Sequence, residues 1–110
     1  MISSEQLRGA DGPVGIVRVA VTSDAVRITL SGEIDVLLDR ELDDAARAVR
    51  EHRLPVVVDA TAVTFMDSCG VRFIGRCYAH GPLTVAASPT VRFLLQILAM
   101  DEVLTPPGNS

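Results

Sequence analysis

Two short runs near the start of the chain alternate between hydrophobic and polar positions, which is the period of a β-strand. The apolar positions are Val17, Val19 and Val21 in the first run, and Val26, Ile28 and Leu30 in the second. The short link at Ser23 and Asp24 predicts a hairpin, so we expect the two strands to pair antiparallel.

From Asp35 onward the apolar positions recur at helical spacing, which predicts a first helix with Asp35 as its N-cap. Its expected core positions are Leu38, Leu42, Ala45 and Val49. Asp43 stands four residues before Arg47, and Arg47 four before Glu51. This spacing is typical of an outer, solvated face of the helix and not of a functional site.

The β-branched run Val56, Val57 and Val58 predicts a central parallel strand that is covered on both faces. We expect a loop over residues 60–66 and then a second helix that opens at Asp67 and Ser68. The expected core positions of this helix are Val71, Ile74, Cys77 and Tyr78, and Gly81 with Pro82 closes it.

Residues 83–87 predict a further short strand, and Ser88 and Pro89 supply the N-cap and first position of a third helix. Its expected core positions are Val91, Leu94, Leu95 and Leu98. The order of elements predicts one α/β domain, an open mixed sheet of about four to five strands with helices following the parallel strands. We expect residues 1–13 to be flexible, residues 14–104 to form the domain and residues 105–110 to be a disordered tail.

The composition of the chain argues against several classes of function. The chain has 110 residues and a net charge of −4, and all ten of its basic residues are arginine. This balance does not favour nucleic-acid binding, and the absence of lysine excludes Schiff-base chemistry. No apolar stretch approaches the roughly 18 to 20 residues that cross a bilayer, so we expect a cytoplasmic protein without a membrane partner.

Cysteine and histidine usage predicts neither a disulfide nor a metal site. Cys69 and Cys77 lie eight residues apart on one expected helix, too far apart along its axis for a disulfide. His52 and His80 are scattered, and Asp35 and Asp59 are better explained by turns than by magnesium. We therefore expect no metal and no cofactor.

In an α/β sheet the loops that leave the carboxyl ends of parallel strands gather on one edge. Residues 32–35, 59–68 and 87–89 are such loops, and Ser68 opens a helix among them. A serine there is either a simple cap or a modification site, because a phosphate at a helix start would meet free amides and the positive end of the dipole. Hydrolysis is disfavoured because His52 and His80 fall at the far ends of their helices.

Several segments together resemble one bacterial family, the STAS-domain anti-sigma factor antagonists. The segments are residues 65–71, preceded by Val56, Val57, Val58 and Asp59; residues 32–35; Ser88 and Pro89 with Val91 and Arg92; and residues 99–104. The resemblance covers residues 14–104 and implies a STAS-like domain that is not an enzyme.

The resemblance implies partner switching. The unphosphorylated antagonist would bind an anti-sigma factor, often itself a serine kinase, and so free a sigma factor for transcription. Phosphorylation of Ser68 would dissolve that complex, and a phosphatase would reverse the step. The implied partner-binding residues are Asp35, Asp67, Cys69, Gly70 and Arg72.

Two positions depart from the family pattern, and they leave alternatives open. Cys69 replaces a common serine or threonine, and a thiol at a helix start could have a lowered pKa and support a small thiol-dependent enzyme. Arg72 stands where glycine is usual, and Arg72 or Arg76 could meet an acidic partner surface or the phosphate itself. A further alternative is a STAS scaffold in a larger signalling complex, never phosphorylated.

Overall fold

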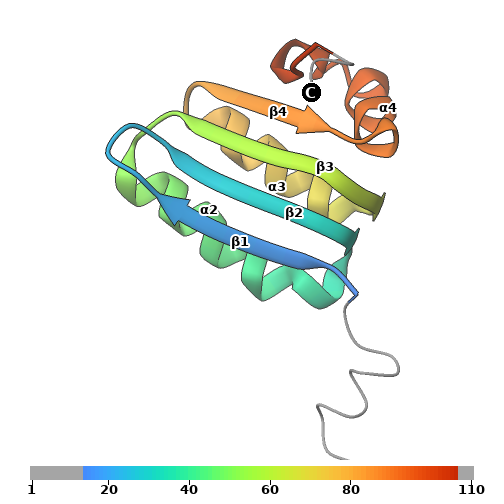
Figure 1. Cartoon of the computed structure of the whole chain (residues 1–110), viewed down its shortest axis with the longest axis horizontal. Helices are drawn as coiled ribbons and strands as arrows, with labels where there is room; N and C mark the ends of the chain where they lie inside the picture. Colours follow the sequence, from blue (N-terminus) through green and yellow to red (C-terminus); the bar gives the residue numbers. More distant parts are fainter. Residues whose placement is uncertain (1–13, 107–110) are drawn as a thin grey trace, which may run out of the picture.

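The computed structural model describes residues 14–106, which contain one four-stranded sheet in the order β1-β2-β3-β4 (Figure 1). Strand β1 (Ile16–Val21) pairs antiparallel with β2 (Val26–Ile34). Strand β2 pairs parallel with β3 (Val56–Met66), and β3 pairs parallel with β4 (Leu83–Ala87). The predicted hairpin and the mixed α/β sheet are confirmed.

Helices follow each parallel strand. A short 3₁₀ turn η1 (Val36–Leu38) and helix α2 (Asp39–His52) follow β2, and α3 (Ser68–Ala79) follows β3. Helix α4 (Pro89–Ile97) follows β4 and packs on β3 and β4, before a second 3₁₀ turn, η2 (Asp101–Val103). Helices α2 and α3 lie side by side against one face of the sheet (Figure 1).

The hydrophobic core fills the space between that sheet face and the helices. Its largest fully buried side chains are Val26, Ile28, Leu30, Ile34, Leu42, Val49, Val58, Phe73, Ile74, Val85, Val91 and Leu95. Val26, Ile28 and Leu30 recur every second residue on β2, and the buried α2 residues Leu42, Ala45, Ala46 and Val49 fall at helical spacing, so each element presents one apolar side to the core. The core therefore arises from the two periods that the sequence displays.

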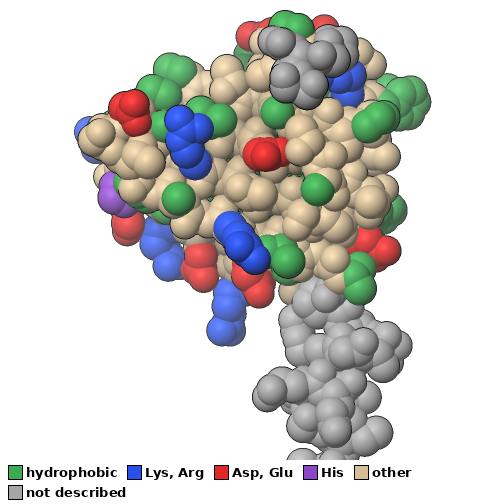
Figure 2. Space-filling model, viewed as in Figure 1, with side chains coloured by type: hydrophobic (Ala, Val, Ile, Leu, Met, Phe, Trp, Pro, Cys, Tyr) green, Lys and Arg blue, Asp and Glu red, His purple; other side chains and the backbone are tan. Residues whose placement is uncertain are grey.

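The opposite face of the sheet is open. Arg27, Thr29, Asp59 and Thr84 are exposed on it, and Val57 is half-buried. Figure 2 shows this face as a mixture of backbone, polar and scattered apolar groups. The prediction that the valine-rich strand is covered on both faces is therefore wrong, because helices α2 and α3 both cover the other face of the sheet.

Strand β3 is longer than the sequence predicts. The expected loop over residues 60–66 is instead strand, because β2 continues to pair with it as far as Met66. The register shifts between Thr29 and Ser31 on β2, where the opposite strand carries an extra residue. There the Asp59 carboxylate accepts hydrogen bonds from the Thr61 amide at 3.0 Å and the Thr61 hydroxyl at 2.6 Å. These bonds lower the pKa of Asp59.

Two helix boundaries differ from the prediction. Asp35 does act as an N-cap, accepting from the Leu37 amide at 3.0 Å, but it caps η1, and α2 begins only at Asp39. Helix α4 ends at Ile97, so Leu98, predicted to be in the core, is exposed. Ser88 and Pro89 begin α4 as predicted.

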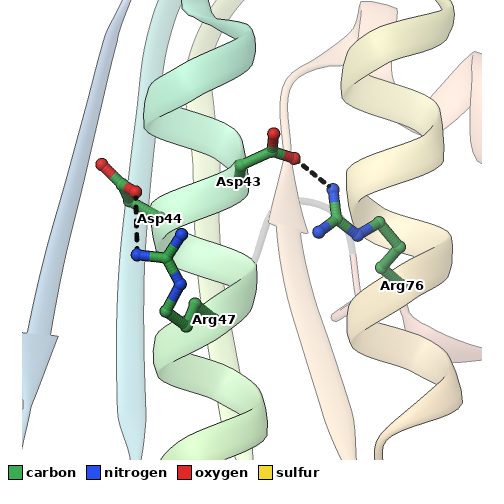
Figure 3. A network of polar contacts seen from close by, with 4 residues as sticks. All are labelled: Asp43, Asp44, Arg47 and Arg76. Carbon is green, nitrogen blue, oxygen red and sulfur yellow. Dashed lines mark hydrogen bonds and ion pairs between the residues drawn. The ribbon is translucent and has the colours of Figure 1, made fainter.

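The outer face of α2 is exposed as predicted, and it carries ion pairs (Figure 3). Arg47 pairs with Asp44 at 3.4 Å and not with Asp43 or Glu51. Asp43 pairs instead with Arg76 of α3 at 2.7 Å, which lowers the pKa of Asp43. The Asp43–Arg76 pair joins the two helices on their solvent side.

The C-terminal end of the described chain packs on β4. The Thr105 amide donates to the Val85 carbonyl at 2.9 Å, and the Arg92 guanidinium donates to the Thr105 carbonyl at 2.7 Å. The packed chain thus reaches Thr105, one residue beyond the predicted boundary. The predicted N-terminal segment, residues 1–13, and residues 107–110 lie outside the described part of the chain.

Candidate functional site

The three strand-to-helix junctions that follow β2, β3 and β4 meet along one edge of the sheet. We call this edge the rim and define it as residues 34–39, 65–72 and 87–93. The Asp67 amide donates to the Ile34 carbonyl at 3.0 Å, which joins the first two junctions. The Ser88 amide donates to the Ala60 carbonyl at 3.0 Å and ties the third junction to β3. The first two junctions therefore converge as predicted, whereas the third joins β3 at Ala60, before that strand ends at Met66.

Ser68 is the first residue of α3, and its side chain is exposed. The N-cap is its neighbour Asp67, whose extended backbone (φ −99°, ψ −168°) aims its carboxylate at the Cys69 amide, 2.8 Å away. Within residues 14–106 the Ser68 hydroxyl makes no hydrogen bond. The alternative in which Ser68 is a simple cap is thus wrong, because Asp67 has that role.

Three amides in the first turn of α3 are already bonded. Besides the Cys69 amide, the Gly70 and Val71 amides donate to the Asp67 carbonyl at 3.1 and 3.2 Å. A phosphate on Ser68 would not find these three donors free, contrary to the expectation from the sequence. The positive end of the helix dipole would still favour the added charge.

Close packing fixes the start of α3 against the strand ends. Gly70 is buried, and a Cβ atom at that position would lie 2.5 Å from Met66 Cγ and 3.0 Å from Ile34 Cγ2. A glycine is therefore required sterically where α3 crosses β2 and β3. This packing leaves Ser68, two residues earlier, pointing outward on a rigid support.

The structure brings most of the predicted partner-binding residues together at the rim. Asp35, Asp67 and Cys69 are half-buried, Arg72 is exposed one turn after Ser68, and Gly70 is buried beneath it. Asp35 and Asp67 each use a carboxylate oxygen to cap a backbone amide.

The thiol of Cys69 lacks the activation that the sequence left open. Its pKa is raised, first by burial and then by the charges of Asp67 and Asp39, which outweigh Arg72. Burial raises the pKa of Cys77 to about 12, and both cysteines are free. A raised pKa leaves little thiolate at neutral pH, which disfavours a thiol-dependent enzyme centred on Cys69.

Exposed apolar side chains lie on all three segments of the rim, and the sequence prediction missed them. Val36 is 62% exposed, Leu37 42%, Phe65 48% and Phe93 61%. The sequence feature that could have identified these residues is that each falls outside the core-facing period of its element. Exposed apolar groups beside polar ones are typical of protein–protein contact surfaces.

The described residues do not favour histidine-based hydrolysis or metal binding at the rim. His52 ends α2 and His80 caps the C-terminus of α3, so both lie at the opposite ends of these helices from Ser68. In the described chain, no group of three or more His, Cys, Asp or Glu side chains could hold a metal ion. None of the helices in residues 14–106 has the length and apolar character needed to span a membrane.

Comparison with known families agrees with this architecture. The family model described as Mlab, STAS domain, matches residues 17–106. The chain belongs to this STAS family. No curated protein matches the sequence.

Solved structures of STAS proteins resemble the chain over most of its length. An anti-sigma factor antagonist from Mycobacterium paratuberculosis has 25% sequence identity and a TM-score of 0.72, covering 86% of this chain and 88% of that one. The anti-sigma factor antagonist SpoIIAA in its unphosphorylated form has 21% identity and a TM-score of 0.67, over 86% and 90%. The Bacillus cell fate determinant SpoIIAA in its phosphorylated form has 21% identity and a TM-score of 0.65, over 86% and 93%. This STAS domain is thus similar in structure to anti-sigma factor antagonists.

Proposed function

We propose that this STAS protein is an anti-sigma factor antagonist switched by phosphorylation of Ser68. The unphosphorylated form binds an anti-sigma factor that has serine-kinase activity and thereby releases a sigma factor. A phosphatase restores the binding form. The protein is a cytoplasmic regulatory binding module whose covalent state is set by other proteins, and it carries out no catalysis itself.

The observation that carries this proposal is the free, exposed hydroxyl of Ser68 at the rim. Asp67 caps α3, so Ser68 is not needed to begin the helix. A phosphoryl group transferred from ATP to the Ser68 oxygen replaces the hydroxyl proton and leaves the backbone unchanged. Likeness to an anti-sigma factor antagonist at 25% identity supports the same assignment.

The apolar side chains of the rim explain how a phosphate on Ser68 would prevent a partner from docking. Val36, Leu37, Phe65 and Phe93 offer apolar surface that a partner would cover. A phosphoserine adds a charge of about −1.5 to −2, and stripping its water shell beneath a docked partner is costly. Docking would therefore lose affinity without any change in the fold.

Kinase assays with matched variants test the proposal. The purified chain, a candidate anti-sigma kinase and Mg-ATP should give one phosphate per chain, mapped to Ser68 by mass spectrometry. Ser68→Ala should abolish incorporation. Thr90→Ala is the control, because Thr90 is also an exposed hydroxyl in the first turn of a rim helix, and it should leave incorporation unchanged.

A parallel capture experiment tests the partner. Unmodified protein and Ser68→Asp protein serve as baits in lysate from the native cell, and the captured proteins are identified by mass spectrometry. The proposal predicts that an ATPase-like anti-sigma factor is retained by the first bait and lost from the second. Equal retention by both baits, or phosphate on a residue other than Ser68, would contradict it.

A further inference from the structure

Arg72 is an exposed cation one helical turn after Ser68, and it has no partner of its own. Within residues 14–106 no carboxylate forms an ion pair with it. One turn further along α3, Arg76 is already held by Asp43 of α2 at 2.7 Å. Residues four apart on a helix are neighbours on its surface, so the Arg72 side chain shares a face with Ser68.

Apart from Arg72, the charged groups that act on Cys69, the neighbour of Ser68, are acidic. Asp35 caps η1, Asp39 begins α2 and Asp67 caps α3. Helices α2 and α3 run side by side (Figure 3). The charges of Asp39 and Asp67 raise the pKa of the Cys69 thiol, and the charge of Arg72 opposes them. A dianion on Ser68 would therefore enter a negative environment in which Arg72 supplies the compensating charge.

Three backbone amides close to Ser68 are not free to balance the charge of a phosphate on that residue. The Cys69, Gly70 and Val71 amides at the start of α3 are all bonded to Asp67. A phosphate on Ser68 that used them would first have to displace the cap. A guanidinium offers paired N–H donors that fit two phosphate oxygens, and Arg72 is exposed on the same face of α3 as Ser68.

We propose that Arg72 is the internal counter-ion of the phosphate on Ser68, with its guanidinium donating to two phosphate oxygens across one turn of α3. The pair stabilises the phosphorylated state of this chain and leaves the unmodified state unaffected. This inference rests on the proposed phosphorylation of Ser68. It goes further by assigning to this chain the group that accommodates the phosphate.

The test measures the second ionisation of the phosphate directly. Phosphoserine is installed at residue 68 during translation, so no kinase is needed, and the phosphorus resonance is followed by NMR against pH at low salt. The second pKa of phosphoserine is about 6. Arg72 favours the dianion and lowers that pKa, so Arg72→Gln should raise it by about 0.3 unit, a roughly twofold change in proton affinity.

Arg47→Gln is the matched control, because Arg47 is an exposed helical arginine on α2 that pairs with Asp44. It should leave the phosphate pKa unchanged, and about 1 M salt should remove most of the difference caused by Arg72→Gln. An unchanged or lower pKa in Arg72→Gln, or an equal rise in both variants, would overturn the inference. Failure of the proposed function would be seen separately, as anti-sigma binding that is insensitive to the installed phosphate.

Discussion

Two of the helices that start at the rim do so with a serine, and the two serines have opposite environments. Ser88, before Pro89 of α4, is 6% exposed and accepts a hydrogen bond from the Val91 amide at 3.4 Å. Ser68 of α3 is exposed, and the capping bond of its helix is made by Asp67. The same residue type is therefore a structural cap in one helix and a free hydroxyl in the other. A shift of one position relative to the cap decides which serine is buried and which is exposed.

The largest expected loss of stability comes from substitution of Gly70, the buried glycine near the start of α3. Gly70→Ala places a methyl group 2.5 Å from Met66 Cγ, so side chains must move, and we expect a loss of about 1 to 3 kcal/mol in the free energy of unfolding. Gly75→Ala is the control in the same helix, because open space surrounds that position. It should stabilise by about 0.5 to 1 kcal/mol. Urea denaturation measures both, and equal effects would contradict the packing account.

The next largest loss of stability is expected on substitution of Asp67, and it distinguishes the role of Asp67 from that of Ser68. Asp67→Ala removes the charged cap of α3, and we expect a loss of about 1 to 2 kcal/mol. Ser68→Ala should change the free energy of unfolding by less than about 0.5 kcal/mol, because an exposed hydroxyl is lost from a capped helix. The same denaturation experiment compares them. A larger loss in Ser68→Ala than in Asp67→Ala would reverse the assignment of the cap.

A somewhat smaller loss is expected at the buried serine. Ser88→Ala should cost about 1 kcal/mol, since the Val91 amide loses its side-chain acceptor. The hydrogen bond here is longer than the one made by Asp67, and it lacks a charge. Replacement of Ser88 by Asn keeps an acceptor but enlarges a buried side chain, so Ser88→Thr is the milder control. If Ser88→Ala were as stable as the unsubstituted protein, the contrast between the serines would disappear.

The smallest expected effect is on the alkylation rate of the Cys69 thiol, next to Ser68. The raised pKa of Cys69 predicts slower alkylation at neutral pH than an unstructured cysteine shows. The rate should increase as the pH rises toward that pKa, because the thiolate is the reacting form. Cys77, with a pKa of about 12 and a buried side chain, should react only when the protein unfolds. Rapid alkylation of Cys69 at neutral pH would revive a thiol-based chemistry at the rim.

The sequence predicted most of the fold because its signals were local. The alternation in β1 and β2, the helical spacing after Asp35 and the Ser88–Pro89 helix start each correspond to an element of the structure. The length of β3 was not predictable in this way. Its pairing partner lies far away in the sequence, and the shift in register near Asp59 breaks the alternation that would reveal a strand.

The candidate site was predictable in position but not in its details. The rule that loops gather at the carboxyl ends of parallel strands located Ser68 correctly at the rim. Two adjacent residues, Asp67 and Ser68, are both good caps by type, and the backbone angles of Asp67 decide between them. The partner of Asp43 likewise depends on how α2 lies against α3, which no spacing within α2 encodes.

The central claim is that a phosphate on Ser68 controls docking at the rim. The most direct measurement is the affinity of the anti-sigma factor for the unmodified protein and for protein with phosphoserine installed at residue 68. We expect the phosphate to weaken binding by at least about tenfold, because it adds charge and a desolvation cost at the contact. Equal affinities of the two forms would contradict the account.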